Sequence, residues 1–181
     1  PSVIVSPTRD RFLEAEGVRH PSIADLAAPM LRLAGLRINP ATNGRHHPPR
    51  IVGLKLVNIA DGKTIALKTP AKAYLSAPIW SSDGKHFAFT NTLTETSKTV
   101  VGGKHLNITT DQRPGIELWV GDAETGAVKR ISGVRINAVY GEPVQWMSDQ
   151  KTLLVQLVPA NLGKAPEEPP VPLGPNVQEN E

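Results

Sequence analysis

The chain has 181 residues, and 20 Lys and Arg against 17 Asp and Glu give it a net charge of only +3. It contains no block of basic residues, so nucleic acid is not an expected partner. The absence of cysteine excludes disulfides, thiolate zinc sites and cysteine nucleophiles. No apolar run approaches the roughly 20 residues that would cross a bilayer, so no membrane span is expected.

The first predicted element is a hairpin. Residues 2–5 form a β-prone run, residues 6–10 are typical of a turn, and residues 11–16 favour a second strand. The chain starts at Pro1 without a basic-then-apolar leader. We therefore expect this start to be a processing site or the edge of an expressed piece, with any targeting signal outside it.

A helix is predicted over residues 22–34. Ser22 can cap it, and Asp25 stands three residues later, close to a capping box. Pro29 predicts a kink inside the helix, and Gly35 suits its C-terminal stop. The apolar residues that would share one helical face are Ile23, Leu26, Ala27, Met30, Leu31 and Ala34.

After the helix, the pattern returns to strands. Residues 39–49 are rich in turn residues, residues 51–58 favour a strand, and Asp61-Gly62 is a hairpin signal before residues 64–67. These two strands would be the outer pair of a four-stranded sheet whose inner pair precedes the helix. The prediction is therefore an insertion over residues 22–49 between strands two and three of one sheet.

A second four-stranded unit follows. Its strands are predicted at residues 77–80, 85–92, 116–120 and 127–131, with a polar excursion between the second and third over residues 91–114. A third unit begins at Pro143 and ends at Val158. The Pro-, Gly- and Glu-rich residues 160–181 have no periodicity and favour an extended loop or linker.

One ungapped pattern opens each of the three units. Each copy has an apolar residue, a polar turn and a new apolar run, and the copies begin at Val5, Trp80 and Trp146. Such periodic strand-turn-strand units indicate a repeat architecture. We predict an all-β fold, a partial β-propeller of about two and a half four-stranded blades over residues 1–159 with one short helical insertion. The tryptophans would wedge between adjacent blades.

Longer strings resemble the glutamyl endopeptidases, a branch of the prolyl oligopeptidase-like (S9) serine peptidases. The likeness runs from about Val3 to Glu179. It is strongest in Leu-Arg-Leu-Ala-Gly-Leu-Arg-Ile at residues 31–38, joined to residues 39–45, 80–89, 117–126 and 169–175.

The resemblance implies an N-terminal propeller that covers a C-terminal α/β-hydrolase domain, whose serine sits in a Gly-x-Ser-x-Gly elbow. This chain has no such elbow, since Ser132-Gly133 lacks the spacing, so no catalytic residue can be assigned. The expected function is to gate access of peptide substrates to a hydrolase domain of the same parent chain. The alternative is a non-enzymatic propeller that binds protein or carbohydrate. The resemblance favours a periplasmic, secreted or organellar location.

Other candidate sites favour structural readings. His46 and His47 are expected to point in opposite directions on an extended chain, and no carboxylate stands at ligand spacing, so no metal site is predicted. Gly102-Gly103 lacks the strand-to-helix setting of a phosphate loop, and no cofactor is expected. Asn107-Ile108-Thr109 matches a glycosylation sequon, a frequent chance match.

Arginines of the insertion are the candidate substrate-binding residues. A peptidase that prefers glutamate needs a cation beside the substrate carboxylate, and the guanidinium fork suits it. The insertion and its loop contain Arg32, Arg37, Arg45 and Arg50. Of these, Arg37 and Arg45 are selected as the candidates.

Overall fold

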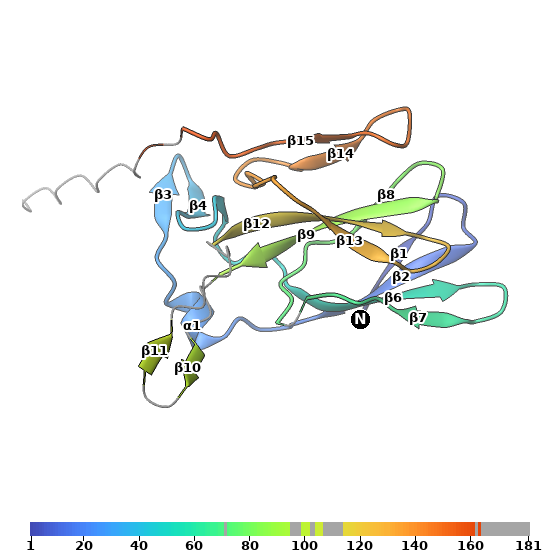
Figure 1. Ribbon diagram of the computed structural model, residues 1–181, viewed down its shortest axis with the longest axis horizontal. Helices are drawn as coiled ribbons and strands as arrows, with labels where there is room; N and C mark the ends of the chain where they lie inside the picture. The colour runs from blue at the N-terminus through green and yellow to red at the C-terminus, as the bar shows by residue number, and fades with distance from the viewer. Residues whose placement is uncertain (71, 95–98, 102–103, 107–113, 162, 164–181) are drawn as a thin grey trace, which may run out of the picture.

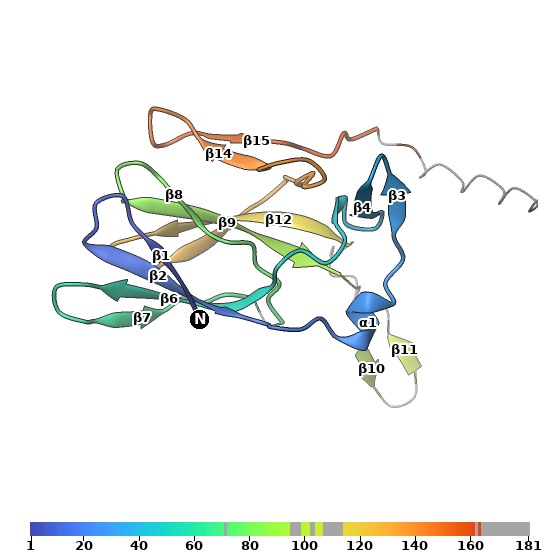
Figure 2. The ribbon, with the colours of Figure 1, turned by 180° about the vertical axis from the view of Figure 1, so that it is seen from behind.

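The computed structural model describes residues 1–70, 72–94, 99–101, 104–106, 114–161 and 163. They form two four-stranded antiparallel sheets and a two-stranded hairpin that lie side by side as consecutive blades (Figures 1 and 2). The predicted all-β, partial-propeller fold is therefore confirmed. Within the described residues, no helix is long and apolar enough to cross a membrane.

Blade 1 has the strand order β1-β2-β6-β7. Its strands are β1 (Ser2–Val5), β2 (Arg11–Gly17), β6 (Ile51–Asn58) and β7 (Thr64–Ala66). The inner pair precedes the insertion and the outer pair follows it, as the sequence predicts. The side chains of β1 and β2 alternate between the interblade core and solvent. Leu13 is fully buried against blade 2, while Val3 and Val5 on the opposite face of the sheet are 58% and 52% exposed.

Blade 2 has its strands in the order β8-β9-β12-β13. They are β8 (Ile79–Trp80), β9 (His86–Leu93), β12 (Gly115–Asp122) and β13 (Val128–Ile131). The predicted excursion between β9 and β12 contains a small hairpin that the sequence analysis did not predict, β10 (Thr99–Val101) with β11 (Lys104–Leu106). Blade 3 is represented by β14 (Val144–Trp146) and β15 (Leu153–Val155).

The three copies of the motif share one turn geometry. The fifth residue of each copy is left-handed, with φ of 58° at Arg9, 68° at Gly84 and 59° at Gln150. In each copy the N–H of this residue donates to the carbonyl of the second residue, at 2.9 to 3.0 Å. The ungapped register read from the sequence is thus the register of the fold, although only one copy has the glycine that this backbone favours.

The turns of neighbouring blades touch. A Cβ added to Gly84 would lie 2.6 Å from the Thr8 hydroxyl oxygen, so the second turn packs closely on the first. The Ser82 N–H donates to the Gln150 side-chain oxygen over 2.6 Å, which joins the second turn to the third. The first strands of the blades are therefore linked at this end.

The two predicted wedge tryptophans form the same interblade bond. The Trp80 indole N–H donates to the Ile4 carbonyl of blade 1, and the Trp146 indole N–H donates to the Ile79 carbonyl of blade 2, both over 3.1 Å. Each carbonyl belongs to the inner strand of the preceding blade. The indole thus fills the seam with apolar surface and gives its one polar atom a partner there.

The main core lies between blades 1 and 2 and centres on Phe87 and Phe89, which are 0% and 2% exposed. Phe87 meets Trp80 edge to face at 5.4 Å between ring centroids, and Phe89 stacks on Trp119 at 6.3 Å. A second cluster lies between blade 2 and the β14-β15 hairpin, with Ile136 at 0% exposure.

The predicted helix over residues 22–34 is wrong beyond its first turn. The capping box forms as expected, but α1 (Ile23–Leu26) ends after four residues. Pro29 cannot continue a helix, because it lacks the N–H and clashes with the preceding turn. The next residues form a hairpin whose loop, Ala34-Gly35, has positive φ at both positions (46° and 84°), as a two-residue type I′ turn requires.

The insertion is consequently a small sheet with one helical turn. Its strands are β3 (Leu31–Leu33), β4 (Leu36–Asn39) and β5 (Gly44–Arg45), in the order β3-β4-β5. Figures 1 and 2 place this sheet beside the end of the blades where β12 begins, away from the motif turns.

Candidate functional site

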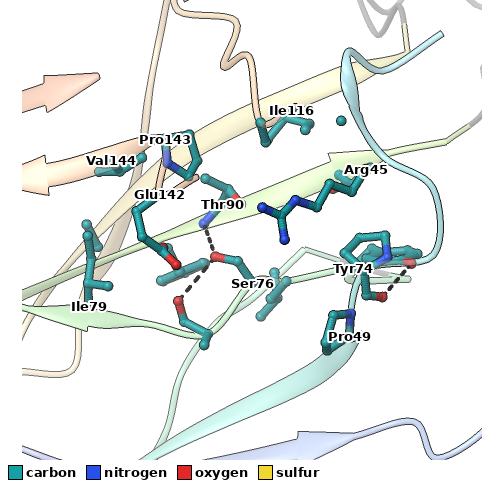
Figure 3. A pocket seen from close by; sticks show the side chains of 18 of the residues that line it. Arg45, Pro49, Tyr74, Ser76, Ile79, Thr90, Ile116, Glu142, Pro143 and Val144 are labelled. Carbon is teal, nitrogen blue, oxygen red and sulfur yellow. Dashed lines mark hydrogen bonds between the residues drawn. The ribbon is translucent and has the colours of Figure 1, made fainter. Parts of the chain in front are cut away.

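A cavity of about 250 Å³ lies where the insertion, blade 2 and the connector from blade 2 to blade 3 (residues 132–143) meet (Figure 3). Its apolar wall comes mainly from β8, β9, β12 and β14. Its lining residues are Thr42, Gly44, Arg45, Pro48, Pro49, Tyr74, Leu75, Ser76, Ala77, Ile79, Ala88, Phe89, Thr90, Thr92, Ile116, Ala138, Gly141, Glu142, Pro143 and Val144.

A polar strip crosses this apolar wall. Ser76 and Thr90 bind each other: the Thr90 N–H donates to the Ser76 Oγ and the Ser76 N–H donates to the Thr90 carbonyl, both at 3.0 Å. The Tyr74 hydroxyl donates to the Pro48 carbonyl over 3.1 Å. Burial raises the pKa of Tyr74 above its usual range, so this hydroxyl is a neutral donor at physiological pH.

Arg45 extends into the cavity toward Thr90 and Ser76 (Figure 3). The register of the insertion explains this direction. Arg45 pairs directly with Ile38 across β4 and β5, and directly opposed side chains of an antiparallel pair share one face of the sheet. Ile38 is 8% exposed, and Arg45 leaves the same face of the small sheet and lines the cavity.

Arg37 is placed differently. It is the neighbour of Ile38 on β4, so its side chain leaves the opposite face of the strand, and it is exposed. It pairs across the hairpin with Arg32, another exposed cation, and it does not line the cavity. Both selected arginines are exposed, and of the two only Arg45 also lines the cavity. A substrate-binding role remains a prediction for both.

The fourth arginine of the group supports a wall of the cavity. The Arg50 guanidinium lies 5.0 Å from the centre of the Tyr74 ring, a cation–π contact, and its Nε donates to the Ala73 carbonyl over 3.4 Å. Arg50 thus fixes the ring of a lining residue from outside the cavity.

Glu142 is the second charged residue of the lining, a feature that sequence reasoning missed because nothing in its local pattern distinguishes it. In the described part of the chain no ion pair joins Glu142 to Arg45.

The Ser76 hydroxyl donates its proton to the Ala77 carbonyl over 3.3 Å. The cavity lining contains no His or Lys that could remove this proton as a general base. Arg45, Glu142 and the Ser76-Thr90 pair give this largely apolar lining a few polar groups, an arrangement typical of small-molecule binding sites.

The expectation that His46 and His47 point in opposite directions is wrong. Their ring centroids lie 3.7 Å apart, because His47 has φ of 56° and the chain is not extended there. Burial, with the neighbouring His47 and Arg37, lowers the pKa of His46. Over the described ranges, no group of three or more potential ligands could hold a metal ion. Gly102-Gly103 and the Asn107 sequon lie outside the described residues.

Two curated relatives match this chain along its entire length. The rice protein named "Probable glutamyl endopeptidase, chloroplastic" is 30% identical over 189 residues, and its namesake in Arabidopsis thaliana is 32% identical over 195 residues. The chain spans 19% and 18% of the length of these relatives. The resemblance to glutamyl endopeptidases is therefore confirmed for a piece that spans about a fifth of their length.

The other comparisons add less. No family model matches the chain. A crystal structure described as a "putative dipeptidyl aminopeptidase IV" from Bacteroides ovatus aligns with 14% sequence identity and a TM-score of 0.45. The alignment covers 86% of this chain and 20% of the Bacteroides ovatus chain.

Proposed function

We propose that this glutamyl endopeptidase-like chain forms blades of a propeller that limits which peptides reach a peptidase site elsewhere in its parent protein. The similarity to glutamyl endopeptidases, which covers the full length of this chain, supports the proposal. The described blades supply hydrogen-bonded sheets and a lined cavity, which suit a gating domain. The partner would be an α/β-hydrolase domain of the same parent chain, and an organellar location is proposed from the chloroplastic relatives.

Within this gate, Arg45 would bind acidic side chains of the peptide. The observation that carries this step is that Arg45 lines the cavity and points toward Thr90 and Ser76 (Figure 3). A guanidinium can hold a carboxylate by two parallel hydrogen bonds, and the exposure of Arg45 leaves it open to an incoming peptide. Glu142 on the same lining would repel the carboxylate and direct it toward Arg45.

The test uses the full-length protein and pairs of peptides that differ only in Glu against Gln. Arg45→Ala should lower the preference for the Glu peptide, measured as the ratio of kcat/KM values, by about 10- to 100-fold, the range expected for a hydrogen-bonded charge. Arg45→Lys should restore only part of it, because an ammonium lacks the fork.

Arg37→Ala is the matched control. It removes an exposed arginine from the same small sheet without touching the cavity, so the Glu preference should remain at its original value. Equal preferences in the original protein and in Arg45→Ala would refute the role of Arg45. Peptide binding by a parent protein that shows no turnover would favour the non-enzymatic binding module.

A further inference from the structure

The insertion of blade 1 reaches past blade 2 and docks on the connector that leads to blade 3. The Ala138 N–H of the connector donates to the Asn43 carbonyl of the insertion over 2.9 Å. Gly44 and Ala138 form an isolated parallel bridge. These contacts join segments that belong to different blades and lie far apart in the sequence.

A side chain at Gly44 would fit only if the end of the Ile116 side chain moved. A Cβ built there would lie 2.8 Å from Ile116 Cδ1 and 3.4 Å from the Thr42 hydroxyl oxygen. Both neighbours are held, since Ile116 is 5% and Thr42 2% exposed. Gly44 does not have positive φ, so the position selects glycine for close approach.

The connector is itself fixed to two blades. The Ile136 N–H donates to the Ile116 carbonyl of β12, and the Asn137 N–H donates to the Gln156 carbonyl beyond β15, both over 2.9 Å. Ile136 is fully buried. A few residues later the same connector supplies Glu142 to the cavity. Insertion, connector and β12 therefore meet at Gly44, and the residue that follows it is Arg45.

We propose that Gly44 is a positioning residue that sets where Arg45 stands in the cavity. Close packing of Gly44 on Ile116 and Ala138 holds β5 against the connector, so Arg45 and Glu142 keep a fixed separation across the lining. A side chain at position 44 lifts β5 from this surface and moves the guanidinium away from the peptide carboxylate. The inference rests on the proposed role of Arg45 in binding acidic peptides.

The experiment introduces Gly44→Ala into the full-length protein and measures two quantities. Hydrogen exchange at the Ala138 amide should become about tenfold faster, because overpacking opens the dock. The Glu-over-Gln preference should fall about tenfold, through a higher KM for the Glu peptide.

Rescue distinguishes positioning from general damage. Ile116→Val deletes Cδ1, the atom nearest to the added Cβ, so Gly44→Ala/Ile116→Val should regain both slow exchange and the Glu preference. The control is Gly17→Ala, whose Cβ would meet only the Arg50 carbonyl, at an ordinary 3.7 Å, and which should change neither quantity.

The outcomes separate the two proposals. Slow Ala138 exchange and full Glu preference in Gly44→Ala, with the preference lost in Arg45→Ala, would overturn the positioning role and leave the proposed function intact. Faster exchange in Gly44→Ala with the Glu preference unchanged in both variants would support the dock and overturn the proposed binding role of Arg45. Failure of Ile116→Val to rescue exchange would overturn the packing argument.

Discussion

Gly121 of β12 is the position at which an added methyl group should do most harm. An ideal Cβ there would lie 2.1 Å from Phe87 Cζ and 2.2 Å from Cε2, because Gly121 pairs directly with Phe87 across β9 and β12. The ring would have to retreat by about 1.5 Å to restore normal contact. It cannot do so freely, since it is 0% exposed and packs between Trp80 and Phe89.

We therefore expect Gly121→Ala to cost about 3 kcal/mol, the upper part of the range for an overpacked core. The assay is hydrogen exchange of the β9 amides in the full-length protein, because a multidomain chain gives no single free energy of unfolding. A loss of this size corresponds to exchange about 100-fold faster wherever opening of the blade limits exchange.

Gly115→Ala is the matched control on the same strand. Its Cβ would meet the Arg135 side chain at 3.3 Å, and that long side chain can move aside. We expect a change below about 0.5 kcal/mol, the level of an ordinary tolerated substitution. Similar exchange rates in Gly121→Ala and Gly115→Ala would refute the reasoning from Phe87.

Three further predictions concern the seams, the first turn and the isolated chain. Trp146→Phe removes the indole N–H that crosses from blade 3 to blade 2 and should speed exchange in β14 and β15 about tenfold; Trp119→Phe, whose N–H binds Glu117 in its own sheet, should not. Hydrogen bonds from Arg11, then Thr8 and Ser6, hold the pKa of Asp10 well below its ordinary value. The ionised Asp10 carboxylate therefore stabilises the folded state at pH values above its unfolded-state pKa of about 4. This stabilisation is lost as the pH falls toward the depressed folded-state pKa. In Asp10→Asn, the rate of proteolysis at the turn of the first motif copy should therefore rise less steeply as the pH is lowered. Expressed alone, the 181-residue chain should assemble or aggregate in sedimentation velocity, because among the described residues blade 3 is only the half blade β14-β15, which leaves a strand edge unpaired; reversible unfolding of a monomer would contradict this.

The repeated turn was predictable because its signals are local. A polar turn between two apolar runs, repeated in one register, fixed the three hairpins and the seam position of Trp80 and Trp146. The sequence also predicted the interruption of blade 1 between its second and third strands. What it could not supply was the left-handed backbone at Arg9 and Gln150, since neither residue type indicates it.

The insertion was misread because one set of residues fits two patterns. Leu26, Met30 and Leu31 satisfy helical spacing, yet Pro29 and the Ala34-Gly35 turn favour a hairpin. The cavity was beyond sequence reasoning for another reason. Arg45 faces it only because β5 pairs with Ile38 and docks near Ala138, and such contacts between distant segments leave no local pattern.

The contacts between successive motif turns make the sequence of one blade depend on that of the next. The left-handed backbone at position 84 favours glycine, and the Thr8 side chain lies so close that an added Cβ would overlap it. A larger residue at position 84 would be tolerated only together with a smaller one at position 8. Substitutions at the motif turns should thus occur as pairs in adjacent blades. Exchange of single blades between related propellers should fail at these turns, even where each blade would fold by itself.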